Sequence, residues 1–247
     1  MTTRIRLNLG NVAAVQGHGA VLFDATSAAG DRWFVKVARR AIPSPENLAG
    51  REILGARIAT ACEMGTPDVR LAELDRPPIH VDALPSPTNL YVASERLDAP
   101  ARVQSWKELS PDDRVKLVVF GAITASGAER FDSMSGQPRD VYRVRRAGGP
   151  EVVVLDFESI NAGRPIPPLA SATLPPEFAM IDALDSIRRS EADVVIETLM
   201  MALERDLDAW CDDASAVGLN LDRSALRAAL NANCETIGNA LQQRLRS

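Results

Sequence analysis

The sequence is poor in metal-ligating side chains. It has 3 cysteines and 2 histidines in 247 residues. Cys62, Cys211 and Cys234 lie far apart and form no Cys-x-x-Cys pair. A structural zinc site and a disulfide scaffold are therefore not expected, and a sparse, odd set of cysteines is typical of a reducing compartment.

Long apolar runs and an excess of positive charge are also missing. No uninterrupted apolar run approaches the roughly 18 residues that a membrane span needs, and residues 1–10 contain no apolar signal core. The 28 basic and 33 acidic residues give a net charge of −5, so no overall basic field attracts nucleic acid or anionic lipid. We therefore expect a cytoplasmic protein without nucleic-acid or membrane partners.

The composition is that of an ordinary globular protein. Apolar residues make up 46% of the chain and charged residues 25%, which excludes a disordered or collagen-like chain. At about 150 residues per domain the length predicts one or two domains, most simply one unit with two lobes. Because the net charge is negative, a phosphate-rich ligand has to be held by a local cluster of donors or by a metal.

Short strands dominate the first 97 residues. Polar–apolar alternation and β-branched runs predict the strands, and Ala29-Gly30-Asp31 predicts a hairpin turn. Ser44-Pro45-Glu46, followed by apolar residues at helical spacing, predicts one helix that ends at Cys62 or Glu63. The predicted strands are Arg4–Leu9, Ala20–Asp24, Arg32–Ala38, Val69–Leu74 and Asn89–Ser94.

The remainder of the chain is predicted to be mainly helical, so the fold class is α+β. A β-rich lobe that contains one helix is expected over residues 1–97, and a mainly helical lobe over residues 98–247. The predicted segments of the second lobe are a connector over 98–112, a helix over 111–124 capped by Ser110, a loop over 125–140, a hairpin of Val141–Arg145 and Val152–Phe157, an irregular proline-rich stretch over 161–177, and helices over 176–246 broken at Gly218-Leu219-Asn220.

Lys36 and Glu52 are the first candidate pair for a functional site. Lys36 lies within the apolar strand Arg32–Ala38, where a buried ammonium needs an anionic partner. Glu52 lies in the helix that follows, and it either faces solvent or pairs with Lys36. Such a pair would fix the ammonium so that it can hold nucleotide phosphates.

Asp140 and Asp156 are the candidate metal ligands. Asp156 follows the apolar run Val152–Leu155, and Asp140 precedes the partner strand of the same predicted hairpin. The two ends of a hairpin lie close together, and carboxylates brought together repel unless a cation separates them. Mg²⁺ prefers carboxylate and phosphate oxygens, so the pair predicts a magnesium site; the alternative is an aspartate that caps a turn.

Two loops complete the candidate site. Gly17-His18-Gly19 precedes a predicted strand, and a glycine-containing turn there either lies over phosphates or is an ordinary turn. Glu129 and Asp132 lie in the predicted loop before Asp140 and could orient an attacking hydroxyl group, although a solvated charged loop explains them equally well.

Four segments resemble a protein-kinase-like fold, and most closely its HipA-like and phosphoinositide-kinase-like branch. They are GHGAVLFDATSAAGDRWFVKV, REILGARIA, LYVASERL and VVVLDFES, within residues 10–160. The resemblance implies a two-lobed fold that binds ATP and Mg²⁺. By position it implies that Lys36 contacts phosphates, Glu52 holds Lys36, Asp156 binds Mg²⁺, and the backbone around Ser94-Glu95-Arg96 meets adenine.

The predicted catalytic loop departs from this branch, which has the pattern Asp-Arg-His-x-x-Asn. One register places Glu129-Arg130-Phe131 on Asp-Arg-His, and a second places Ser135 on the catalytic aspartate. Both registers place Asp140 on the metal-side asparagine. They leave the base open between Glu129, Asp132 or no base at all.

The resemblance implies an ATP- and Mg²⁺-dependent phosphotransferase that acts on a protein serine or threonine. The divergent loop leaves open a pseudokinase that binds a nucleotide or a regulatory protein partner. A small-molecule kinase similar to aminoglycoside phosphotransferases is a further alternative, although those enzymes have a histidine that this loop lacks. The alternative that is not a kinase is a helical binding protein with a β cap, which would not bind ATP.

Overall fold

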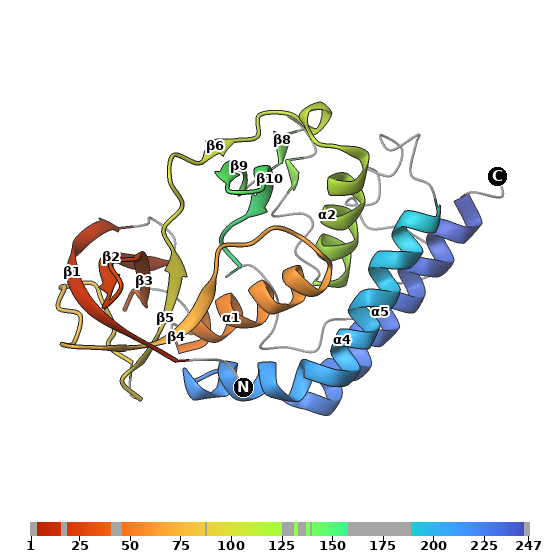
Figure 1. Cartoon of the computed structure of the whole chain (residues 1–247). Helices are drawn as coiled ribbons and strands as arrows, with labels where there is room; N and C mark the ends of the chain where they lie inside the picture. Colours follow the sequence, from red (N-terminus) through yellow and green to blue (C-terminus); the bar gives the residue numbers. More distant parts are fainter. Residues whose placement is uncertain are drawn as a thin grey trace.

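The fold is described from a computed structural model of the chain. The structure describes residues 4–15, 19–40, 46–86, 88–124, 131–132, 137–138, 140–157 and 189–244. A small β-barrel lies at one end of the molecule, and long helices lie at the other, with a short β-hairpin above one of them (Figure 1).

The barrel is formed by five strands in the order β1-β2-β3-β5-β4. Neighbouring strands are antiparallel except for β1 and β4, which pair in parallel and close the barrel through pairs such as Ile5↔Ala72 and Leu7↔Leu74. Closure leaves no unpaired sheet edge along these pairs. The strands are β1 (Ile5–Val15), β2 (Ala20–Ser27), β3 (Arg32–Ala38), β4 (Val69–Leu74) and β5 (Leu90–Glu95).

Side chains of β3 alternate between the barrel interior and the outside. Trp33, Val35 and Val37 belong to the apolar cluster that fills the barrel. Because successive side chains of a strand point to opposite faces, Lys36 points away from this cluster. It pairs across the sheet with Val92, which belongs to the second, larger core between the barrel and the helices.

Helix α1 (Glu46–Ala61) covers the outer face of this part of the barrel (Figure 1). Ile53, Leu54 and Ile58 are fully buried or nearly so and join the larger core. After the helix, the carbonyl oxygen of Gly65 accepts a hydrogen bond from the Val154 N–H at 2.9 Å. This bond ties the segment after α1 to a distant hairpin.

That hairpin consists of β9 (Val141–Arg146) and β10 (Gly149–Val154). It forms a small sheet with β6 (Ala101–Arg102), and a 3-10 turn, η1 (Trp106–Glu108), follows β6. A separate short ribbon pairs β7 (Phe131–Asp132) with β8 (Gln137–Pro138).

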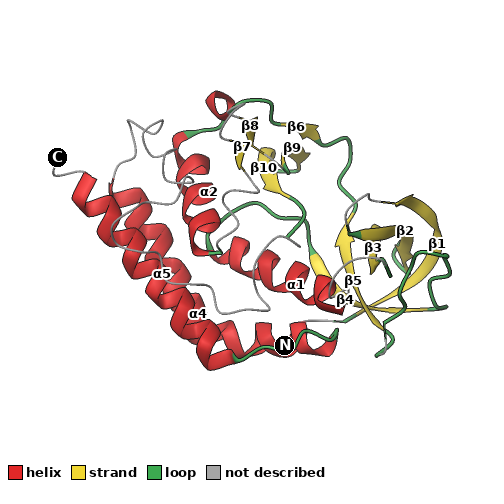
Figure 2. Ribbon diagram, turned by 180° about the vertical axis from the view of Figure 1, so that it is seen from behind, coloured by secondary structure: helices red, strands yellow, loops and turns green. Residues whose placement is uncertain are grey.

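Helices α2 (Pro111–Ile123), α4 (Arg189–Ala216) and α5 (Arg223–Arg244) form the helical part. Ser110 caps α2, because its Oγ accepts the Asp113 N–H at 3.1 Å. The long helices α4 and α5 lie side by side, and α4 runs along α1 (Figures 1 and 2). No helix in the described part of the chain is long and apolar enough to span a membrane.

Most predicted elements are confirmed, with corrections at strand ends and in two segments predicted to be irregular. β1 continues to Val15, beyond the predicted end at Leu9, because it is bulged and so interrupts the simple alternation. β10 ends at Val154, so Asp156 follows the strand and does not close it. The predicted connector contains β6 and η1, and the predicted loop over 125–140 contains the paired strands β7 and β8. The predictions for residues 125–130 and 161–177 lie outside the described residues.

The three cysteines are buried. Burial raises the pKa of the Cys62 thiol, and it raises the pKa of Cys234 to about 12. Both thiols therefore stay protonated near neutral pH, where the thiolate is the reactive form. We expect a thiol reagent such as Ellman's reagent to modify the folded protein very slowly and all three cysteines rapidly in guanidinium. Rapid reaction of one cysteine in the folded protein would contradict this burial.

Candidate functional site

Lys36 is a buried cation that holds two carboxylates. Its Nζ lies 2.9 Å from Glu52 Oε1 and 3.0 Å from Asp156 Oδ1. The Lys36 side chain is 8% exposed and that of Glu52 is 2% exposed, whereas Asp156 is 29% exposed. The three charges come from β3, from α1 and from the segment after β10, so this ion cluster joins the barrel to the hairpin.

Glu52 makes a second contact with the segment that carries Asp156. Its Oε2 accepts a hydrogen bond from the backbone N–H of Phe157 at 2.9 Å. One carboxylate oxygen therefore binds the lysine, and the other binds the amide next to Asp156. Since a buried carboxylate needs such partners, Glu52 fixes Lys36 and the Asp156 segment relative to each other.

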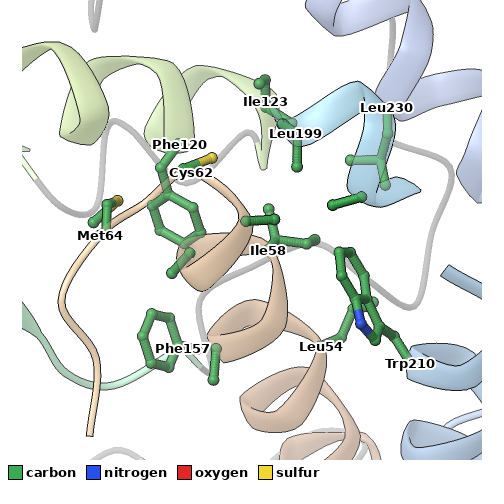
Figure 3. Close-up of a cluster of buried hydrophobic side chains, with 14 of the residues drawn as sticks. Leu54, Ile58, Cys62, Met64, Phe120, Ile123, Phe157, Leu199, Trp210 and Leu230 are labelled. Carbon is green, nitrogen blue, oxygen red and sulfur yellow. The ribbon is translucent and has the colours of Figure 1, made fainter. Parts of the chain in front are cut away.

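The ring of Phe157 anchors the same segment in the larger core. Phe157 is fully buried and packs edge-to-face against Phe120 of α2, with ring centroids 6.0 Å apart. Figure 3 shows this ring below that of Phe120, alongside α1. The backbone at position 157 is therefore held by an apolar contact on one side and by Glu52 on the other.

Asp140 and Asp156 are neighbours at the open end of the hairpin. The Leu155 N–H donates to the carbonyl oxygen of Asp140 at 2.8 Å, directly beyond the last strand pair, Val154↔Val141. Asp140 and Asp156 have φ angles of 57° and 61°. This left-handed region is uncommon for residues other than glycine and is tolerated best by asparagine and aspartate, and such strain often accompanies function.

Tyr142 lies in the field of both aspartates. Burial raises the pKa of its phenol, and the charges of Asp140 and Asp156 raise it further, while Arg102 opposes them. Arg102 stands directly opposite Tyr142 in the β6–β9 pair. The two carboxylates thus act on one common region beside the hairpin.

Comparison of the sequence with known families and with curated proteins gives no match. Solved structures do match the fold. The proinflammatory kinase CtkA of Helicobacter pylori has a TM-score of 0.53 at 8% identity, over 97% of this chain and 98% of that one. The Golgi casein kinase has a TM-score of 0.54 at 9% identity, over 100% and 74%. Hydra Fam20 has a TM-score of 0.55 at 8% identity, over 98% and 86%.

The chain has a protein-kinase-like fold. At these identities the likeness concerns the fold alone, and it shows a scaffold on which phosphotransferases are built.

The carboxylates near the hairpin fit a hard cation that takes its other ligands from the phosphates of a substrate and from water. Among the described residues, no group of three or more histidine, cysteine, aspartate or glutamate side chains could hold a metal ion. Asp140 and Asp156 supply two carboxylates. Mg²⁺ is commonly bound by one or two carboxylates, with the remaining oxygens coming from phosphates and water.

In the segment predicted to contact adenine, Ser94-Glu95-Arg96, two backbone N–H groups already donate hydrogen bonds within the protein. The N–H of Glu95 donates to Asp68 O at 2.8 Å, and that of Arg96 donates to Arg32 O at 2.9 Å. The Glu95 carboxylate accepts from the Asp68 N–H at 3.2 Å and from Arg146 at 3.3 Å. A nucleobase would therefore have to use other backbone groups of this segment.

The remaining predicted residues are only partly described. Gly19 is buried, and its carbonyl oxygen accepts the Arg39 N–H at 3.0 Å. Asp132 lies in β7, opposite Gln137. Gly17, His18 and Glu129 lie outside the described residues.

Sequence reasoning missed the Phe157 amide and Tyr142. The Phe157 N–H is a backbone group, and nothing in the side-chain pattern distinguishes it. Tyr142 did carry a signal, since it is an aromatic residue two positions after Asp140 in the sequence.

Proposed function

We propose that this protein is an ATP- and Mg²⁺-dependent phosphotransferase of the HipA-like branch that acts on a serine or threonine of a protein. The observation that carries the proposal is the contact of Lys36 with both Glu52 and Asp156 within a protein-kinase-like fold. Phosphoryl transfer depends mainly on positioning and on neutralising phosphate charge, and these residues suit that task.

Lys36 is proposed to bind the nucleotide phosphates. Its two carboxylate partners differ in exposure, 2% for Glu52 and 29% for Asp156. We infer that Glu52 keeps its contact when a phosphate arrives, because an unpaired buried carboxylate is costly. Asp156 is the partner that a phosphate oxygen can replace, and it is then available as a cation ligand.

Asp140 and Asp156 are proposed to hold the divalent cation, which would neutralise charge on the phosphates when bound. Glu129 or Asp132 is proposed to orient the acceptor hydroxyl. The turn Gly17-His18-Gly19 is proposed to cover the phosphates.

We propose that the boundary between the two lobes lies between residues 97 and 98. The nucleotide would then bind between residues 1–97 and residues 98–247.

A catalytically degenerate pseudokinase is the second candidate. The observation in its favour is the sequence Glu129-Arg130-Phe131, together with Asp140, where the family pattern has Asp-Arg-His and asparagine. Such a protein would bind the nucleotide through Lys36 and regulate a partner without transferring phosphate.

Calorimetric titration with ATP tests both candidates. We expect the wild-type protein to bind ATP in the presence of Mg²⁺, and we expect the affinity to fall by about tenfold or more in EDTA, since a carboxylate pair without its cation repels phosphate. Transfer of labelled phosphate from ATP to a panel of proteins separates the kinase from the pseudokinase. Absence of ATP binding with and without Mg²⁺ would exclude both.

A further inference from the structure

The C-terminal end of α4 lies behind the helix that carries Glu52. Residues 214–219, here named the α4 elbow, form a Schellman turn. Gly218 has a φ of 102°, its N–H donates to Ser215 O at 3.0 Å, and the Leu219 N–H donates to Ala214 O at 3.1 Å. These bonds fix the backbone at Leu219, whose side chain is almost fully buried.

Gly50 of α1 meets the elbow without a side chain. A Cβ atom at this position would collide with Leu219 Cβ, and it would lie 2.9 Å from Leu219 Cδ2 and 3.1 Å from the carbonyl oxygen of Ala214. Glycine is therefore required for the observed separation of α1 from the elbow.

Glu52 lies on the opposite side of α1 from Gly50. Two residues rotate an α-helix by about 200°. The side of α1 that touches the elbow thus faces away from the side that holds Lys36. A force applied by the elbow at Gly50 is directed toward β3.

Further contacts on the elbow side keep α1 in place. Arg57, two helical turns after Gly50, lies 4.0 Å from Asp213 of α4. Leu54, between them, lies beside Trp210 of α4 (Figure 3). The elbow is also tied to the segment before β5, because Thr88 Oγ1 donates to Ala216 O at 2.9 Å.

We propose that Gly50 and Leu219 are positioning residues for Lys36. The α4 elbow acts as a buttress that holds α1 against β3 and so keeps Glu52 in contact with both Lys36 and the Phe157 amide. The inference rests on the proposed function and extends it. Binding of the nucleotide phosphates by Lys36 would depend on the packing of α4 against α1.

The Phe157 amide provides a readout that does not require a nucleotide. Its hydrogen bond to Glu52 is buried, so its hydrogen exchange reports on the position of α1. We expect Gly50→Ala, which displaces α1, and Leu219→Gly, which removes the buttress, each to accelerate this exchange and to weaken Mg²⁺–ATP binding by about tenfold. In Gly50→Ala/Leu219→Gly the new methyl group occupies vacated space, so the loss is expected to be smaller than the two single losses combined.

Two control variants separate positioning from general loss of stability. Gly238→Ala introduces the same methyl group on α5, where a Cβ meets nothing within 4 Å, and is expected to change neither readout. Leu230→Ala removes a buried side chain from α5, the helix that packs against α4. It is expected to lower the melting temperature without selectively exposing the Phe157 amide.

The inference is overturned if Phe157 exchange in Gly50→Ala and Leu219→Gly rises no more than in Leu230→Ala at matched stability, or if the double variant loses at least the sum of the single losses. A wild-type protein that binds no ATP would overturn the proposed function instead. The exchange measurement would then still decide whether the elbow positions Glu52.

Discussion

Replacing Lys36 with methionine is expected to lower the free energy of unfolding by about 3–5 kcal/mol, the usual effect of removing one partner from a buried ion pair. Glu52 is 2% exposed, and in the variant it keeps the Phe157 amide but loses its cation. The same substitution is expected to abolish ATP binding under the proposed function. Urea unfolding and calorimetry measure the two effects.

Two further variants give the Lys36 result its meaning. Lys107→Met removes an exposed lysine of η1 and is expected to change stability by about 0.5 kcal/mol or less. Lys36→Met/Glu52→Gln removes both buried charges but keeps a side-chain acceptor for the Phe157 amide, and it is expected to regain much of the lost stability without regaining ATP binding. A Lys36→Met protein as stable as the wild type would show that the salt bridge does not contribute in solution.

Asp156→Asn is expected to lower phosphate transfer by about a hundredfold or more, the scale of losing one fixed electrostatic contact to a transition state. Its cost in stability is expected to be about 1 kcal/mol, because Asp156 is 29% exposed and Lys36 keeps Glu52. Asparagine also tolerates the left-handed backbone at this position, where φ is 61°. Transfer of labelled phosphate and thermal unfolding are the measurements.

Glu204→Gln is the matched control for Asp156→Asn. It also neutralises one carboxylate, but on the exposed face of α4. Transfer by this variant should equal that of the wild type. If Asp156→Asn retained full Mg²⁺-dependent transfer, the assignment of Asp156 as a cation ligand would be wrong.

Locally encoded parts of the fold could be predicted from the sequence. The β2–β3 hairpin follows from a turn at Gly30 between apolar runs, and α2 follows from the Ser110 cap and its apolar spacing. Closure of the barrel could not be predicted in this way, because the parallel pairing of β1 with β4 joins residues far apart in sequence. No local pattern specifies which distant strand is the partner.

The candidate site shows the same division. Residue type and strand or helix position were sufficient to single out Lys36, Glu52 and Asp156. The internal use of the Glu95 amide could not be foreseen, because it depends on how the chain before β4 meets β5. The contact of Gly50 with Leu219 is likewise a product of tertiary packing.

The parallel β1–β4 pair also sets an order of events during folding. Ile5 and Ala72 lie far apart in the sequence, so a long loop must close before they can pair. Closing this loop costs chain entropy before any hydrogen bond of the pair forms. High contact order of this kind slows folding. During synthesis, β1 therefore pairs on one side only, with β2, until β4 has left the ribosome.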